Sequence, residues 1–312
     1  MDAGVFVLGM HRSGTSAATR LVNLLGVPTA REDDLVQPTA DNPTGFWESA
    51  SLVSFNTRVL GAVGSETGCP LRLEPGWERD SRLDGLRTEA GAVFAAALPG
   101  APWVWKDPRN CLTFAFWRSV LDDVRPVVVL VGRNPSEIAA SLHARDGEGA
   151  IYAFALWERY LRQALSSIEG LPVLVTRYDE LLDAPLDWCS RTRVFLADAG
   201  VDSVDPQAED VHSFVDRGLR HASFTTEDFM ADGSTSEAQR ALFAALAEAA
   251  GAHECFVVPA LPAETPTTEA LVAERRRTVE ARRELRRLQG NDPSPSRVSA
   301  ARRLMALARA AL

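Results

Sequence analysis

A short apolar run near the start of the chain leads directly into a loop with two glycines and then into a helical segment. Residues 5–9 have the composition of a buried strand, and Gly9 and Gly14 lie five residues apart in the loop. Glycines at this spacing before a helix allow backbone N–H groups and the positive helix end to surround an anion. The sequence therefore predicts a phosphate-binding turn at the edge of a parallel sheet.

This loop differs from that of ordinary nucleoside triphosphatases at one position. Residues 9–16 follow the pattern G-x4-G-K-[ST], with Ser16 in register, but Thr15 stands where the pattern has lysine. A later strand runs into Arg133, whereas a magnesium-dependent triphosphatase has an aspartate at such a strand end. Both differences favour a phosphate site and count against metal-assisted hydrolysis.

The rest of the chain alternates apolar runs with segments of helical periodicity. Four runs predict buried strands, at residues 5–9, 102–105, 127–132 and 172–176. Helices are expected at residues 15–25, 49–61, 82–98, 112–121, 135–142, 151–168 and 190–199. This order is typical of the α/β class. We predict a three-layer, P-loop-like fold with a central, mainly parallel sheet of four to five strands flanked by helices, plus a C-terminal helical extension.

Composition narrows the class of protein. The chain has 312 residues, of which 46% are hydrophobic and 24% charged, as in globular proteins. We expect a cytoplasmic protein, because the sequence has no apolar run of membrane-spanning length and no signal-peptide pattern. The net charge of −9 argues against nucleic acid as a partner. The four cysteines are widely spaced and do not suggest a metal site.

The character of the sequence changes near residue 259. Residues 259–266 resemble a linker, and helical segments are expected at 269–289 and 297–312. We therefore predict an α/β domain at residues 1–258 and a linker with a basic helical tail at 259–312. The tail is expected to pack on the body or to pair with a second copy in a homodimer. Contact of its last helix with an anionic membrane is the less favoured alternative.

Lys106 is the only lysine among the 33 Lys and Arg residues of the chain. It follows an expected strand and precedes Asp107, Pro108 and Arg109. Since carboxyl ends of parallel strands meet at one edge of a sheet, Lys106 is expected beside the phosphate loop. There its ammonium can neutralise an oxygen between two phosphoryl-like groups. The alternative is a strand-end ion pair with a neighbouring carboxylate.

A second anion site is expected where the strand at residues 127–132 ends. Asn134 is a good N-cap and Pro135 a good first helical residue, so a helix N-terminus and Arg133 converge on one point. Ser141 lies about two turns further along and can donate its hydroxyl to the same anion. This combination suits a phosphate dianion.

Together these segments resemble the sulfotransferases that use 3′-phosphoadenosine 5′-phosphosulfate (PAPS). Residues 9–16 resemble the 5′-phosphosulfate loop of that family, and Arg133 and Ser141, eight residues apart, match its 3′-phosphate-binding arginine and serine. Residues 42–48 and 105–109 are similar to blocks of a large bacterial branch, and the Lys-Asp-Pro run is also similar to the protein-tyrosine sulfotransferases. The resemblance covers about residues 5–195.

The resemblance implies metal-free, in-line transfer of a sulfuryl group from PAPS to a hydroxyl, with adenosine 3′,5′-bisphosphate as product. Arg12 and Lys106 would stabilise the developing charge. The donor-binding residues that it implies are His11, Arg12, Ser13, Gly14, Thr15, Ser16, Arg133, Ser141 and Arg220. The implied acceptor is a small molecule or glycan with a hydroxyl, on a sugar, lipid or natural product, and the sequence does not identify it.

The general base is the part of the site with open alternatives. The small-molecule branch often has a histidine two residues after the lysine, where this chain has Pro108. Glu48 is the preferred base, because a glutamate has this role in the protein-tyrosine branch and its aromatic neighbours would raise its pKa. The other candidates are Asp107, His11 and His143. A P-loop kinase or triphosphatase and a non-catalytic nucleotide-binding scaffold are the alternative functions.

Overall fold

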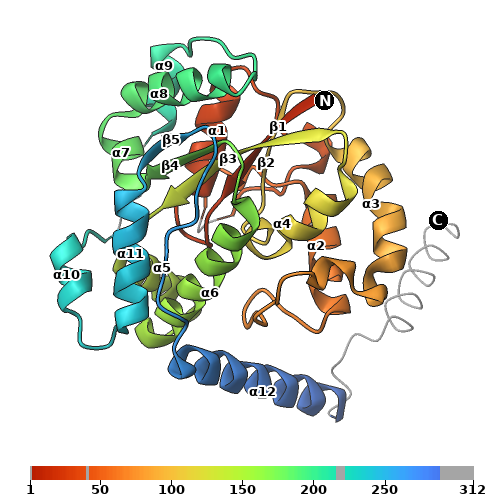
Figure 1. Cartoon of the computed structure of the whole chain (residues 1–312), viewed down its shortest axis with the longest axis vertical. Coiled ribbons are helices and arrows are strands. Elements are labelled where there is room, and N and C mark those ends of the chain that lie inside the picture. Colours follow the sequence, from red (N-terminus) through yellow and green to blue (C-terminus); the bar gives the residue numbers. More distant parts are fainter. Residues whose placement is uncertain (1, 40–41, 216–221, 289–312) are drawn as a thin grey trace, which may run out of the picture.

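The computed structural model, which describes residues 2–39, 42–215 and 222–288, has a twisted five-stranded sheet between layers of helices (Figure 1). The sheet has the order β2-β1-β3-β4-β5. Its strands are β1 (Asp2–Leu8), β2 (Trp103–Lys106), β3 (Val124–Gly132), β4 (Val173–Arg177) and β5 (Gly251–His253). The first four are parallel, and β5 is antiparallel to β4. The predicted α/β fold with a mainly parallel sheet is confirmed.

The sheet is apolar on both faces because each face is covered by helices. Along β1, Val5 and Val7 belong to one core, while Phe6 and Leu8 belong to the other. The first core includes α1 (Thr15–Leu24), α7 (Tyr178–Asp183), α8 (Pro185–Asp198) and α9 (Ala208–Phe214). The second core includes α2 (Ala50–Ala62), α3 (Asp84–Ala97), α4 (Asn110–Val120), α5 (Pro135–Asp146), α6 (Ala150–Ile168), α10 (Thr226–Ala231) and α11 (Glu237–Glu248).

Three short 3₁₀ helices lie in the connections, at Glu32–Asp34, Trp77–Arg79 and Ser81–Leu83. The last helix, α12 (Pro266–Leu288), follows residues without regular structure and lies beside α6 (Figure 1). Ion pairs join the two segments, because Arg159 of α6 donates to Glu264 at 2.9 Å and to Glu269 at 2.6 Å. The predicted second tail helix, at 297–312, lies outside the described residues.

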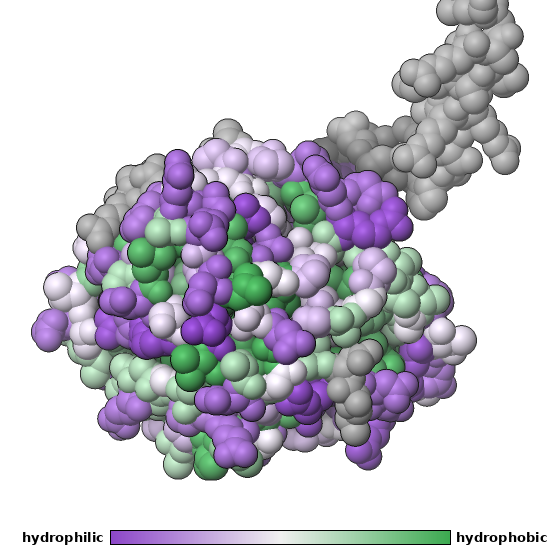
Figure 2. Space-filling model, turned by 90° about the horizontal axis from the view of Figure 1, so that it is seen from above, coloured by the Kyte–Doolittle hydropathy of each residue, from purple (hydrophilic) through white to green (hydrophobic). Residues whose placement is uncertain are grey.

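The face drawn in Figure 2 carries hydrophilic side chains interspersed with smaller hydrophobic areas. The described helices include none that is both long enough and apolar enough to cross a membrane. In the same part of the chain, no group of three or more His, Cys, Asp or Glu residues could hold a metal ion. The four cysteines are free thiols.

Candidate active site

The loop between β1 and α1 has the backbone of an anion-binding turn. Arg12 and Gly14 have positive φ values of 67° and 88°, and Gly14 is the N-cap of α1. No described side chain caps this helix, so its first N–H groups remain available to a ligand. A Cβ atom at Gly14 would lie 2.1 Å from the Tyr178 ring, which makes glycine necessary there.

A cavity of about 630 Å³ opens at this end of α1. The loop, α5 and the start of α7 contribute to its wall. Six of the predicted donor-binding residues line it, namely Arg12, Gly14, Thr15, Ser16, Arg133 and Ser141. The fold therefore brings together three segments that are far apart in the sequence, as the sheet topology predicts.

Arg12, Ser141 and Arg133 form a connected polar wall of this cavity. The Arg12 Nε donates to the Ser141 Oγ at 2.8 Å, and one terminal nitrogen of Arg133 donates to the Arg12 carbonyl at 2.8 Å. The Arg133 guanidinium also lies 4.4 Å from the centre of the Tyr178 ring and donates to Glu137 at 2.8 Å. Glu137 was not expected in this wall from the sequence.

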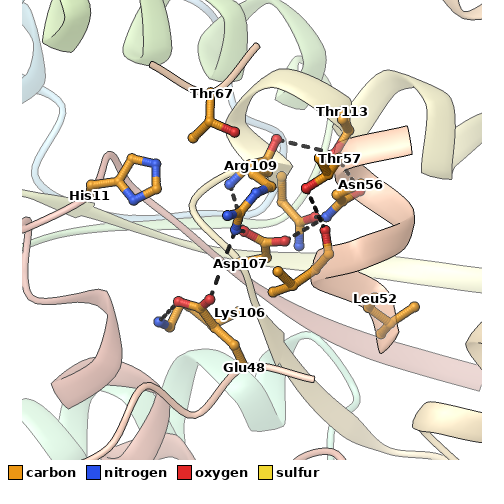
Figure 3. A network of polar contacts seen from close by, with 12 residues as sticks. His11, Glu48, Leu52, Asn56, Thr57, Thr67, Lys106, Asp107, Arg109 and Thr113 are labelled. Carbon is orange, nitrogen blue, oxygen red and sulfur yellow. Dashed lines mark hydrogen bonds and ion pairs between the residues drawn. The ribbon is translucent and has the colours of Figure 1, made fainter. Parts of the chain in front are cut away.

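Lys106 is buried beside the loop and connects Ser16 of the cavity wall to Glu48 (Figure 3), although neither Lys106 nor Glu48 itself lines the cavity. It pairs with Val7 in the sheet register, which places it next to the start of the phosphate loop. Its ammonium donates to the Ser16 Oγ at 3.1 Å and lies 2.5 Å from the Glu48 Oε1. Lys106 thus contacts the loop and also makes the alternative strand-end ion pair, with Glu48 as the partner.

Glu48 precedes α2, whose N-cap is Ser49, and it is nearly buried at 8% relative exposure. The residue before it, Trp47, has a positive φ of 57°. Burial raises the pKa of Glu48 above its usual value, although the neighbouring Lys106 and Arg109 act in the opposite direction. A buried carboxylate with a raised pKa is a stronger base than an exposed one.

The other candidate bases are occupied by protein contacts. Both oxygens of the buried Asp107 accept hydrogen bonds, from Asn56 and from the backbone and guanidinium of Arg109. His143 is exposed near the end of α5, and its Nδ1 lies 3.1 Å from the Glu148 carbonyl. Glu48 also has a protein partner in Lys106, but it keeps 8% relative exposure whereas Asp107 has none, and it therefore remains the better-placed carboxylate.

His11 points towards α6 rather than into the cavity. Its Nε2 lies 3.1 Å from the Tyr160 hydroxyl, which itself donates to the Thr67 carbonyl at 2.9 Å. Because that hydroxyl has only one proton, His11 must be the donor in the first contact. Burial, followed by the charge of Arg109, lowers the pKa of His11 to about 3, so the ring is neutral.

Ser13, which was also predicted to bind the donor, does not line the cavity. Ser13 is buried at 1% relative exposure in the turn, and its N–H donates to the Met10 carbonyl at 3.2 Å. Arg220 lies outside the described residues. Glu137 could have been found from the sequence, because it stands four residues after Arg133 on the expected helix and such pairs meet on one helix face.

Comparison with known proteins gives similarities to several solved structures, two of which are sulfotransferases of low sequence identity. No family model and no curated protein matches the chain. A sulfotransferase domain from the curacin biosynthetic pathway is 13% identical, with a TM-score of 0.41, and the match covers 88% of this chain and 97% of that one. The sulfotransferase STF9 from Mycobacterium avium is 16% identical, with a TM-score of 0.40 and coverages of 77% and 75%. At such identities neither structure assigns a role to any residue of this chain.

Proposed function

We propose that this protein is a sulfotransferase that moves a sulfuryl group from PAPS to a hydroxyl of a sugar, lipid or natural product. The observation that carries the proposal is the position of Lys106, whose ammonium reaches Ser16 of the phosphate loop from a neighbouring strand. A triphosphatase loop has its lysine within the loop itself, where this chain has Thr15. The cation is thus supplied from outside, and β3 ends at Gly132 followed by Arg133 rather than an aspartate.

The cavity suits a nucleotide with phosphate groups at two places. Residues 12–16 and the N-terminus of α1 would hold the 5′-phosphosulfate, because they offer backbone N–H groups, hydroxyls and the Arg12 guanidinium. Arg133 and Ser141 would hold the 3′-phosphate from the α5 side of the same cavity. The volume of about 630 Å³ lies within the range of small-molecule pockets.

Residues in and beside the cavity would perform the transfer by electrostatics and proton movement. PAPS supplies an activated sulfuryl group. Lys106 and Arg12 would stabilise the negative charge that develops on the oxygen of the breaking bond. Glu48 would accept the proton of the acceptor hydroxyl. Lys106 holds Glu48 in the present structure, so a shift of the ammonium towards the donor would leave the carboxylate free to act as the base.

Calorimetry separates this function from the alternatives. The full chain should bind adenosine 3′,5′-bisphosphate without magnesium and should bind adenosine 5′-monophosphate more weakly. Arg133→Met should weaken bisphosphate binding about tenfold or more and weaken monophosphate binding much less, because the charge-assisted contact that it removes is to the 3′-phosphate. Magnesium-dependent ATP binding without bisphosphate binding would show that the proposal is wrong.

The acceptor requires a separate experiment. Incubation of the protein with PAPS labelled in the sulfuryl group and with fractionated extracts of the source cell should label one class of hydroxyl compound. The Lys106→Met variant is the matched control, since labelling that it leaves unchanged does not come from this site.

A further inference from the structure

A buried polar network adjoins Glu48 (Figure 3). It begins at Asn56 of α2 and includes Asp107 and Arg109 in the turn after β2. Asn56 and Asp107 have no exposed surface. The proposed chemistry gives no role to these three residues, although burying so many polar groups together is costly unless each is paired.

The orientation of the Asn56 amide is fixed by its neighbours. Its Oδ1 accepts from the Thr113 hydroxyl at 2.9 Å and from the Trp117 Nε1 at 2.7 Å. An indole N–H can only donate, so the oxygen must face Trp117. The Asn56 Nδ2 consequently faces the Asp107 Oδ2, to which it donates at 2.9 Å.

Asp107 in turn holds Arg109. The Asp107 Oδ1 accepts from the Arg109 backbone N–H and from its guanidinium, both at 2.9 Å. These two bonds close a small ring at the turn, which fixes the direction of the arginine side chain. The same terminal nitrogen of Arg109 lies 4.0 Å from the Glu48 Oε2.

Glu48 therefore has a cation beside each of its two oxygens. Lys106 lies at Oε1 and Arg109 at Oε2. The charged groups that act on Glu48 are these two cations and the Asp107 carboxylate, which opposes ionisation, as does burial. During the proposed reaction Lys106 would move towards the donor, and Arg109 would then be the cation that keeps the carboxylate ionised.

We propose that Arg109 is a positioning residue, which Asn56 and Asp107 hold beside Glu48 so that this carboxylate is ionised and oriented when an acceptor binds. This inference rests on the proposed function, in which Glu48 is the base. Arg109 itself touches neither donor nor acceptor in this role. It acts through the charge that it places 4.0 Å from Glu48.

The test is a direct titration of the Glu48 carboxyl by ¹³C NMR in the full chain labelled at glutamate, with Glu48→Gln to assign the signal. Arg109→Gln keeps a donor for Asp107 but removes the positive charge. It should raise the pH at which the Glu48 carboxyl titrates by about one pH unit or more. The acidic limb of the kcat profile should move upward by the same amount. Arg109→Lys should restore both values towards those of the native chain.

Arg109→Met is the second neutral variant, because its apolar side chain fills similar space without needing a partner. Urea denaturation and bisphosphate binding show whether each variant is folded. A folded Arg109→Gln or Arg109→Met chain in which Glu48 titrates as in the native protein would overturn the inference. Absence of bisphosphate binding and of sulfuryl transfer in the native chain would instead overturn the proposed function, and the NMR titration would still decide the role of Arg109.

Discussion

At the scale of single residues, the site depends on a lysine that is shared between two partners. Lys106 is 1% exposed and contacts both Ser16 and Glu48, so its charge is balanced inside the protein before any ligand arrives. A buried ammonium without such a carboxylate would be costly. The ion pair thus explains how the chain keeps a buried cation ready beside the phosphate loop.

Lys106→Met should lower kcat about 100-fold or more, because it removes the charge that stabilises the leaving oxygen. Bisphosphate binding should be reduced much less, since the rest of the cavity wall is intact. Arg118→Met is the matched control. Arg118 is an exposed cation of α4 that donates to the Ser167 carbonyl at 2.7 Å, away from the cavity, and its loss should leave kcat unchanged. A Lys106→Met enzyme with more than about a tenth of native turnover would contradict the assignment.

His11 should make stability depend on pH in a defined direction. Its pKa is lowered from 6.5 to about 3 in the folded chain. Between these values the unfolded chain binds a proton that the folded chain does not, so the free energy of unfolding falls as the pH is lowered, by at most about 1.4 kcal/mol per pH unit. His11→Asn should reduce the slope of the unfolding free energy against pH. Urea denaturation between pH 6 and pH 4, roughly the window that the two pKa values set, measures this slope. Equal slopes in the native and His11→Asn chains would contradict the prediction.

Most residues of the cavity wall could be predicted from the sequence. The contacts by which buried polar and charged side chains of the site pair with one another could not. Arg12, Arg133 and Ser141 belong to recognisable segments, and the sheet topology alone places them at one edge. The direction of His11 towards Tyr160 depends on how α6 packs, which no local pattern specifies. The role of Asn56 is similar, since a lone asparagine within an amphipathic helix gives no sign that it meets Asp107.

At the scale of elements, the turn into α1 requires a residue without a side chain at Gly14. Gly14→Ala would place a Cβ 2.1 Å from the Tyr178 ring at a φ of 88°, so the turn or α7 must move. We expect bisphosphate binding to be lost and stability to fall. Gly147→Ala is the control, because Gly147 ends α5 with a φ of 71° and a Cβ there would meet no heavy atom of the described residues within 4 Å. It should cost only about 1–2 kcal/mol in urea denaturation. Normal bisphosphate binding by Gly14→Ala would refute this account of the turn.

Periodicity located the parallel strands and most helices that follow them, with differences of a few residues at their ends. The helix expected at 190–199 begins earlier, at Pro185, a favourable first helical residue. Helix α11 was not predicted, although Ser236 and Gln239 form a capping box before it. β5 has three residues, Gly251–His253, and too few apolar side chains to be recognised. Its pairing with β4 is a tertiary event rather than a local preference.

At the scale of the whole molecule, α12 is attached to the body through buried charge. Arg159 is 2% exposed, and Glu264 and Glu269 neutralise it. In addition, the Thr268 hydroxyl donates to the buried Glu158 at 2.8 Å. The predicted boundary near residue 259 therefore separates regions that are in close contact.

A chain ending at Leu261 should lose about 3–5 kcal/mol of unfolding free energy, because the buried Arg159 is left without its carboxylates. A chain ending at Leu288 removes none of these ion pairs and is the matched control. Urea denaturation of both chains checks the prediction. Equal stability of the two truncated chains would mean that α12 contributes little to the folded body.

The two edges of the sheet decide how a second copy of the chain can associate with the first. β2 has four residues and β5 has three, and the Val104 N–H of β2 is already bonded to the Pro28 carbonyl. Such short, partly covered edges offer little template for another strand, which protects the protein against edge-to-edge aggregation. If two copies associate, helices and loops must therefore form the interface. The sheets of the two copies would then stay separate, each with its own cavity at the carboxyl ends of its strands.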